Sequence, residues 1–291
     1  MRVAIHGKTF QKEIRKHIQD LFLWLAKSDT EVCLSSSFSK ILKKAAFKNL
    51  PNNIYEIGDD LGNFDFLLSL GGDGTLLESV THIGSTEVPI VGFNTGRLGF
   101  LATNSPDTVK EVMKSLQAGY YQIEERSLLH LECNKNVFDG LNFALNDFTI
   151  TKRDSASMIT VHTYIDGEYL NSYWSDGLII ATPTGSTGYS LSCGGPLILP
   201  RSSNFVITPV SPHNLTVRPM VISDESVISF EIEGRSKNFL ISLDSRSRVI
   251  DASVQLAVSK EKFKAKLVKV NEINFLDTLR SKLNWGWDAR N

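Results

Sequence analysis

Residues 64–75 constrain the fold of this chain more than any other stretch. An apolar run at 66–70 leads directly into the glycine-rich sequence Gly71-Gly72-Asp73-Gly74-Thr75. A short apolar run that ends at a turn is typical of a buried strand, and Thr75 is placed to cap a following helix. Apolar residues continue beyond it at helical spacing. The sequence therefore predicts a strand, a tight loop and a helix, in that order.

The loop has the features of an anion-binding turn. Glycines at 71, 72 and 74 lack a Cβ, so the backbone can adopt positive φ and bring its N–H groups close to a phosphate at a helix N-terminus. The loop has no lysine, so it is not a Walker A sequence. Its carboxylate, Asp73, would repel phosphate unless a metal ion or a hydroxyl that loses its proton lies between them. The plain alternative is a tight turn in which Asp73 caps the helix.

The surrounding pattern predicts two domains. Residues 1–121 alternate strand-like apolar runs with stretches of helical periodicity, which favours a Rossmann-like α/β domain with a parallel sheet covered on both faces. Residues 122–274 contain short strand-like segments separated by turn residues and favour an all-β, sandwich-like domain. Residues 275–283 have helical spacing, and we expect the tail at 275–291 to pack back on the first domain.

Composition narrows the possible partners. The 291 residues are 42% hydrophobic and 22% charged, with a formal net charge of -1 and no long run of one sign. That balance predicts a globular chain with a small-molecule partner rather than a nucleic acid or a membrane. Cys33, Cys133 and Cys193 are far apart, which suits a reducing cytoplasm. Strand-like residues begin at the start of the chain, so we expect no signal peptide and no membrane span.

A second informative stretch covers residues 175–196. An apolar strand ends at Pro183, and a loop dense in glycine, serine and threonine follows. Such a loop offers N–H donors and short hydroxyls together, which suits ribose hydroxyls, phosphates and the edge of a purine. A serine-rich surface loop is the alternative that the residues leave open.

These stretches resemble the signature sequences of the NAD kinase family. The match is carried by residues 71–75, by Asn146-Asp147 and by 175–196, with further similar segments at 92–101, 211–219 and 279–286. A glycine-Asp-glycine loop also occurs in diacylglycerol-type lipid kinases and resembles part of the phosphofructokinases. The long second stretch is far more specific, and the resemblance spans most of the chain in order.

The resemblance implies an activity and an assembly. It implies transfer of the γ-phosphoryl group of ATP to the 2′-hydroxyl of the adenosine ribose of NAD, giving NADP, with Mg²⁺ as the divalent metal ion. It also implies an α/β domain, a β domain and a site between them. Members of the family are homodimers or homotetramers in which neighbouring subunits complete parts of the dinucleotide site.

Site residues follow from the same resemblance. Asp73 would accept the hydroxyl proton, while backbone donors of the glycine loop would hold the triphosphate. Asp147 stands where relatives often have Glu, Gly188 where many have Ala, and Arg246 where many have Gln. A cation at Arg246 would contact phosphate or face solvent. The binding residues implied for the loop, the dinucleotide and the phosphates are Gly71, Gly72, Gly74, Thr75, Phe100, Asn146, Asp147, Asp176, Thr187, Gly188, Tyr189, Ser190, Ser192, Asp244 and Arg246.

Several of these residues have plainer interpretations. Asn146 and Asp147 would suit a strand-end turn, Asp176 would suit a cap, and Phe100 and Tyr189 would suit a core. Within the implied roles, Asn146 and Asp147 contact base and ribose, Asp176 lies near the nicotinamide, and Phe100 lies against adenine. Asp244 belongs to a loop that approaches the substrate phosphates.

Two other functions compete with an NAD kinase. A lipid or other small-molecule kinase would share the phosphate loop, but the hydroxyl-rich loop at 184–192 and the lack of an amphipathic basic segment disfavour it. A non-catalytic dinucleotide sensor would bind without transfer. It is disfavoured because the loop keeps Asp73, where pure binding would be better served by a neutral or basic residue.

Overall fold

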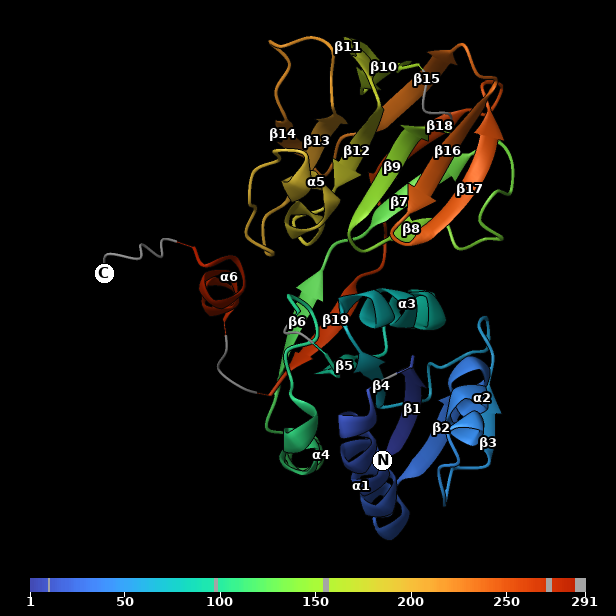
Figure 1. Ribbon diagram of the computed structural model, residues 1–291, viewed down its shortest axis with the longest axis vertical. Coiled ribbons are helices and arrows are strands. Elements are labelled where there is room, and N and C mark those ends of the chain that lie inside the picture. The colour runs from blue at the N-terminus through green and yellow to red at the C-terminus, as the bar shows by residue number, and fades with distance from the viewer. Residues whose placement is uncertain (10, 97–98, 154–156, 271–273, 286–291) are drawn as a thin grey trace. The chain divides into compact units, whose positions relative to one another are not determined.

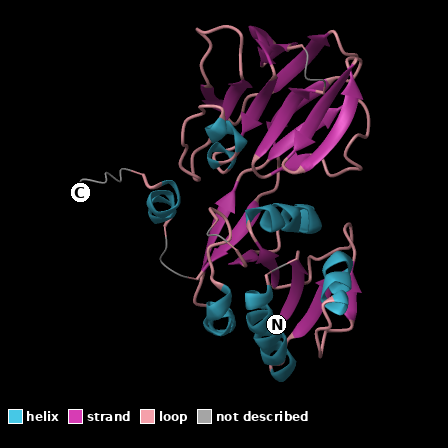
Figure 2. Cartoon of the chain, in the orientation of Figure 1, coloured by secondary structure: helices cyan, strands magenta, loops and turns pink. Residues whose placement is uncertain are grey.

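The computed structural model describes residues 1–9, 11–96, 99–153, 157–270 and 274–285. The chain divides into two compact units, of which the first is Met1–Glu125 with Ala265–Asn291 and the second is Arg126–Lys264. Figure 1 labels their helices and strands, and Figure 2 shows that helices are concentrated in the first unit and strands in the second. None of the described helices is long and apolar enough to cross a membrane.

The first unit is built on one seven-stranded sheet with the order β3-β2-β1-β4-β5-β19-β6. Neighbouring strands from β3 through β19 pair in parallel. This confirms the predicted parallel sheet. The strands are β1 (Arg2–Gly7), β2 (Glu31–Ser35), β3 (Asn53–Tyr55), β4 (Phe66–Gly71), β5 (Ile90–Asn94), β6 (Gln122–Arg126) and β19 (Ala265–Lys269).

Because side chains alternate along each strand, the two faces of this sheet pack against different helices. Val3 and Ile5 of β1 join a core with residues of α1, α2 and α4, whereas His6, which follows Ile5, lies on the face of α3. On β5, a Cβ at Gly92 would lie 2.9 Å from Leu76 Cδ1 of α3, so the strand and the helix are closely packed there. The helical segments are η1 (Lys12–Ile14), α1 (Arg15–Lys27), α2 (Ser36–Lys44), α3 (Asp73–Ile83), η2 (Gly84–Thr86), η3 (Pro106–Thr108), α4 (Val109–Ala118) and α6 (Phe275–Leu283).

The second unit contains two six-stranded antiparallel sheets around one apolar core. Their orders are β11-β10-β15-β18-β7-β8 and β14-β13-β12-β9-β16-β17, and both contribute to the same cluster of buried side chains. This confirms the predicted all-β domain, and the structure shows that its sheets are antiparallel. Its elements are β7 (Leu129–Cys133), β8 (Phe143–Ala144), β9 (Asp147–Lys152), β10 (Ile159–Ile165), β11 (Glu168–Ser175), β12 (Gly177–Ala181), η4 (Gly185–Thr187), α5 (Tyr189–Ser192), β13 (Asn204–Val210), β14 (Met220–Ser223), β15 (Ile228–Gly234), β16 (Asn238–Leu243), β17 (Arg246–Asp251) and β18 (Leu256–Lys260).

One strand lies in a different sheet from the one expected. The segment 263–268 reads as part of the β domain, but the structure places it as β19 in the first unit, where Leu267 pairs with Ile90. The chain therefore returns to the α/β sheet before α6. Strands β3, β11, β14 and β17 each lie at the edge of their sheet.

Candidate functional site

The glycine loop is shaped by a contact between its first and last residues. Helix α3 begins at Asp73 with Gly72 as its N-cap, so the prediction that Thr75 caps this helix is wrong. Instead, a Cβ at Gly71 would lie 2.1 Å from Thr75 Oγ1. Glycine is needed at position 71 because the threonine side chain lies against it, and φ is not positive at this residue, contrary to the expectation for the loop.

The next two glycines are not required by the packing of the described protein. A Cβ at Gly72 or Gly74 would meet no described atom within 4 Å. Their backbone lies at the N-terminus of α3, where the first N–H groups have no partner within the helix and carry a positive partial charge. A bare backbone at such a position is what close approach of an anion requires.

The Asp73 side chain does not cap its own helix but holds the loop that follows β5. Its Oδ2 accepts a hydrogen bond from the Phe100 N–H at 2.7 Å, and Oδ1 accepts from the N–H groups of Leu101 and Ala102 at 3.0 and 3.1 Å. A Cβ at Gly99 would lie 1.9 Å from Oδ1, so this approach requires glycine. Three amide donors on one carboxylate stabilise its anion.

Helix α6 adds a cation to this cluster. Lys282 Nζ lies 3.7 Å from Asp73 Oδ2 and 4.4 Å from the centroid of the Phe100 ring, and that ring also packs against Phe275 at 6.2 Å between centroids. An ammonium group beside the loop is suited to attract phosphate oxygens. Lys282 was not among the residues that the sequence singled out.

In the second unit, Asn146 and Asp147 are held in place through their backbone. Asp244, in the turn between β16 and β17, accepts hydrogen bonds from the N–H groups of Leu145, Asn146 and Asp147 at 2.8–3.2 Å. Its own N–H donates to the Asp147 carbonyl at 3.0 Å. Asp244 has a positive φ of 52°, a conformation that Asp tolerates better than most residues. The carboxylate thus rigidifies the strand end that carries the Asn-Asp pair.

The hydroxyl-rich loop closes over the same strand end. Thr182 Oγ1 donates to the Leu145 carbonyl at 2.6 Å and accepts from the Gly185 N–H at 3.1 Å. A Cβ at Gly185 would lie 1.9 Å from the Asn146 carbonyl oxygen, so only glycine fits there. A Cβ at Gly188 would lie 3.6 Å from Asp147 Oδ2 and 3.7 Å from Asn146 Nδ2. Gly188 therefore lies next to both side chains of the pair.

Asp147 has an unusual protonation equilibrium. The residue is 7% exposed. Burial, with a further contribution from the negative charge of Asp244, raises the pKa of Asp147 to about 7. Burial also raises the pKa of Asp244, but its three amide donors and Arg246 oppose that shift. Asp147 is consequently the member of the pair that holds a proton near neutral pH.

Five of the remaining predicted residues are Tyr189, Asp176, Thr187, Ser190 and Ser192. Tyr189 is 43% exposed, and the pKa of its phenol is raised chiefly by burial and also by Cys193, Asp176 and Asp147. Asp176 forms an ion pair with Lys152 at 2.6 Å. The hydroxyls of Thr187 and Ser190 bond within the protein, to the Thr184 carbonyl and to Thr208, and Ser192 is exposed on α5.

Arg246 adopts an arrangement that the sequence did not suggest. Its guanidinium donates to the carbonyl oxygens of Leu141, at 2.5 Å, and Phe143, and it lies over the rings of Phe138 and Phe143. Burial lowers the pKa of Arg246. The guanidinium therefore stabilises the segment before Asn146, and contact with phosphate stays a prediction.

Arg246→Met should destabilise the second unit. The substitution keeps the apolar stem but leaves two carbonyl oxygens without their charged donor, and we expect the melting temperature to fall by about 3–8 °C. Arg248→Met is the matched control, because Arg248 is exposed and pairs with Asp139 at 3.4 Å on the surface. Thermal unfolding followed by circular dichroism measures both. Equal melting temperatures for the two variants would contradict the structural role of Arg246.

The structure thus gathers the predicted residues into one cluster in each unit. Gly71, Gly72, Asp73, Gly74 and Phe100 lie in the first, and Asn146, Asp147, Gly188, Tyr189 and Asp244 in the second. Sequence reasoning missed Gly99, Thr182, Gly185 and Lys282. All four lie inside stretches that had been singled out, so the stretches were identified but the packing of these residues was not. Arg97, Leu98 and Gly286, which belong to similar segments, lie outside the described residues.

Comparisons with known proteins agree with the resemblance. Residues 3–121 match the family model of the ATP-NAD kinase N-terminal domain, and 145–270 match that of the C-terminal domain. The chain is 52% identical to an NAD kinase of Cytophaga hutchinsonii and 43% identical to one of Flavobacterium psychrophilum, with all of each chain covered.

Two solved structures extend the comparison. Yeast NADH kinase complexed with NADH aligns with a TM-score of 0.85 at 26% identity, over 99% of this chain and 89% of that one. An NAD kinase from Archaeoglobus fulgidus in complex with ATP aligns with a TM-score of 0.72 at 27% identity, over 98% of each chain. With both halves matched and relatives 52% and 43% identical over their full length, this chain belongs to the NAD kinase family.

Proposed function

We propose that the protein transfers the γ-phosphoryl group of ATP to the 2′-hydroxyl of the adenosine ribose of NAD, and that Asp73 positions that hydroxyl. The observation that carries this proposal is the Asp73 carboxylate, which lies at the N-terminus of α3 between two glycines with uncovered backbone. A phosphate-binding turn has no use for a negative charge unless that charge acts on another group of the reaction.

The contacts of Asp73 favour an orienting role. A carboxylate has about four lone-pair sites, and three amides occupy three of them. The remaining site is suited to accept one hydroxyl hydrogen. Phosphoryl transfer is catalysed mainly by positioning and charge stabilisation, so a fixed acceptor that aims the ribose oxygen would supply most of what the chemistry needs. The proton passes to Asp73 as the new P–O bond forms.

The triphosphate would bind at the loop and α3. The N–H groups of Gly72, Asp73 and Gly74 are placed to receive phosphate oxygens, and Lys282 would add a positive charge. Mg²⁺ fits this cluster only in part, because the amides and Lys282 already compensate Asp73. Mg²⁺ usually binds through phosphates with one or two carboxylates. The metal would be held chiefly by the nucleotide, where it neutralises charge on the transferred group.

NAD would bind at the cluster in the second unit. The Asn146 side chain is suited to the edge of a base, and the Asp147 carboxylate to ribose hydroxyls, while Gly188 leaves room beside both. Thr187, Tyr189 and Asp176 extend the same polar surface. The contacts of Asp244 support a role in shaping this cluster through the backbone at 145–147, and its approach to phosphates stays a prediction.

A coupled assay tests the proposed function. Purified protein is incubated with ATP, Mg²⁺ and NAD, and NADP is detected with an NADP-specific dehydrogenase. We expect NADP to form only when all three are present. NAD bound without product would instead support a dinucleotide sensor, and phosphorylation of a lipid in place of NAD would support the second kinase hypothesis.

Two further expectations belong to this proposal. The family resemblance supports a homodimer or homotetramer, and the cysteine pattern supports a cytoplasmic location. Both stay predictions.

A further inference from the structure

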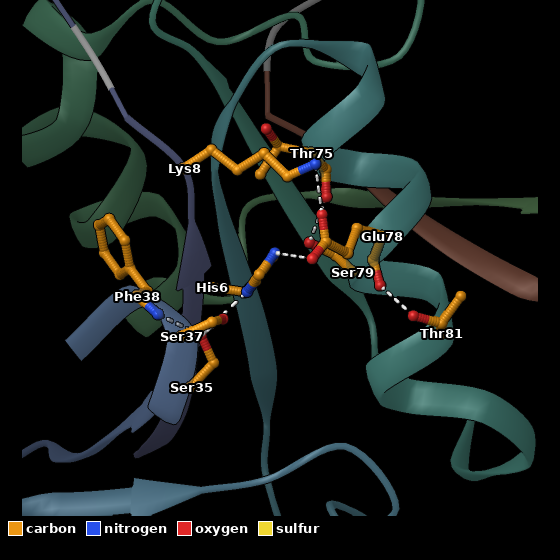
Figure 3. Close-up of polar contacts among 9 residues, drawn as sticks. All are labelled: His6, Lys8, Ser35, Ser37, Phe38, Thr75, Glu78, Ser79 and Thr81. Carbon is orange, nitrogen blue, oxygen red and sulfur yellow. Dashed lines mark hydrogen bonds and ion pairs between the residues drawn. The ribbon is translucent and has the colours of Figure 1, made fainter. Parts of the chain in front are cut away.

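A cluster of histidine and glutamate side chains lies on the α3 face of the first sheet, apart from the proposed catalytic residues. His6 comes from β1, and Glu78 and His82 come from α3, where their i, i+4 spacing places them on one face of the helix. One ligand atom from each residue lies within 4.8 Å of the other two. Figure 3 shows His6 and Glu78 pointing toward each other, with Lys8 on the outer side of the carboxylate.

Three of the four imidazole nitrogens of this cluster are buried without hydrogen-bond partners. His6 is 1% exposed and its Nε2 has no partner, and His82 is 5% exposed with neither ring nitrogen bonded. Ser69, which pairs with His6 in the sheet and faces the same side, also has an unpartnered Oγ. Each buried polar atom left without a partner destabilises a fold by about 1–3 kcal/mol. Such a concentration of unpaired nitrogens points to a ligand that accepts their lone pairs.

The contacts around His6 leave the lone pair of a ring nitrogen available to a cation. His6 Nδ1 lies 2.9 Å from Ser35 Oγ, so when Nδ1 carries the proton, Nε2 presents a lone pair toward Glu78. His6 Nε2 and Glu78 Oε1 face each other at 3.7 Å, too long for a hydrogen bond.

We propose that His6, Glu78 and His82 bind one Zn²⁺-like divalent metal ion. Two imidazoles and one carboxylate are ligands that zinc accepts in tetrahedral sites, with a fourth position for water. Tetrahedral ligands at about 2.1 Å lie about 3.4 Å apart, so the cluster needs only a small inward movement of its side chains. The ion would join β1 to α3, the helix that begins at Asp73.

The two carboxylate oxygens of Glu78 have different partners in this site. Oε1 faces His6, whereas Oε2 binds Lys8 Nζ at 2.6 Å. The Lys8 side chain is 52% exposed and competes electrostatically with a bound ion. The two neighbours of the carboxylate would therefore have opposite effects: His6 supports metal binding and Lys8 opposes it.

Thermal unfolding of the untagged, chelator-treated full chain tests this site. Zn²⁺ at about 100 times its dissociation constant should raise the melting temperature by about 5–10 °C, with one ion bound per chain by calorimetry. Co²⁺ should give the visible absorption of a tetrahedral site. Mg²⁺ at the same concentration should have no effect, because its preferred ligands are oxygens. A wild-type chain that shows neither a shift nor stoichiometric Zn²⁺ binding would overturn the proposal.

Four variants make the test specific. His82→Phe should abolish the Zn²⁺ shift and raise the metal-free melting temperature, because it removes two unpaired nitrogens and keeps the packing of the ring. Glu78→Gln should weaken Zn²⁺ binding at least tenfold, and Lys8→Gln should strengthen it. His17→Gln removes a half-buried histidine of α1 in the same unit, away from the cluster, and should change nothing. If His82→Phe and Glu78→Gln both respond to Zn²⁺ as the wild type does, the ion binds elsewhere and the site is refuted.

Discussion

Asp73→Asn should reduce turnover by about 10²- to 10⁴-fold while NAD still binds. The lower figure is expected if the carboxylate only orients the ribose hydroxyl, and the higher one if it also accepts the proton in the transition state. Most of the dinucleotide affinity should be retained because the Asn146 and Asp147 cluster proposed to hold NAD lies in the other unit. The initial rate of NADP formation and a calorimetric titration with NAD measure the two quantities separately.

The Asp73→Asn substitution would also disturb the loop that the carboxylate holds. An Asn side chain offers one acceptor oxygen and an NH₂ group, so it cannot accept from the three amides of residues 100–102 as the carboxylate does. Displacement of this loop would raise the KM for ATP, whereas loss of the acceptor alone lowers kcat. Gly99→Ala provides the comparison, because its Cβ would collide with Asp73 while the charge remains.

A matched control separates this effect from a general loss of negative charge. Asp107 also lies in the first turn of a helical segment of the first unit, and it is exposed. Asp107→Asn should leave kcat and both KM values unchanged. Unchanged turnover in Asp73→Asn would remove this carboxylate from the chemistry, whatever the loop does.

The parts of the site that lie in one continuous stretch were the predictable ones. The strand, the glycine loop and α3 follow each other directly, so local pattern was sufficient to locate Asp73. The residues that contact Asp73 could not be predicted from local pattern, because Gly99 and Lys282 approach it only through tertiary packing from distant positions in the chain. The same holds for Asp244, whose contacts with the backbone at 145–147 depend on the pairing of β9 with β16. A single sequence carries no signal for such approaches.

The fold was predictable to the extent that strands are buried. Central strands such as β1 and β4 are buried almost throughout, whereas β17 contains Arg246 and Arg248, and β14 has only four residues. Edge strands are short and polar in natural proteins because exposed apolar edges aggregate, and this weakens the pattern that would reveal them. The sheet that contains β19 was predicted wrongly for another reason. Its apolar pattern predicts a strand but does not indicate which sheet it joins.

Replacement of Asp147 should change how the stability of the second unit depends on pH. The folded-state pKa is raised from 3.8 to about 7, so the protonated carboxyl favours folding. Its contribution is fully present below about pH 4 and is lost as pH rises through 7. For ligand-free protein, the free energy of unfolding should therefore fall by on the order of 4 kcal/mol between these limits. Asp147→Asn should lack this decrease and be the more stable protein at pH 8.

Denaturant unfolding at pH 4.5, 6, 7 and 8 measures this difference. Asp139→Asn is the matched control, since Asp139 is an exposed acid of the same unit with a positive φ that Asn also tolerates. Its pH profile should follow the wild type. Parallel profiles for wild type and Asp147→Asn would show that Asp147 titrates as an ordinary surface acid.

Ionisation of Asp147 should also change the affinity for NAD, but in the opposite direction: stability falls as pH rises, whereas NAD affinity increases. Ribose hydroxyls donate hydrogen bonds, so NAD should prefer the ionised Asp147 and bind more tightly as pH rises. With a pKa of about 7, only about a tenth of the ligand-free protein is ionised at pH 6, which predicts an apparent affinity about tenfold lower than at pH 8. Calorimetric titrations at the two pH values should show this ratio in the wild type and none in Asp147→Asn. A ratio that persists in the variant would assign the linked proton to another group and leave Asp147 without a role in holding the ribose.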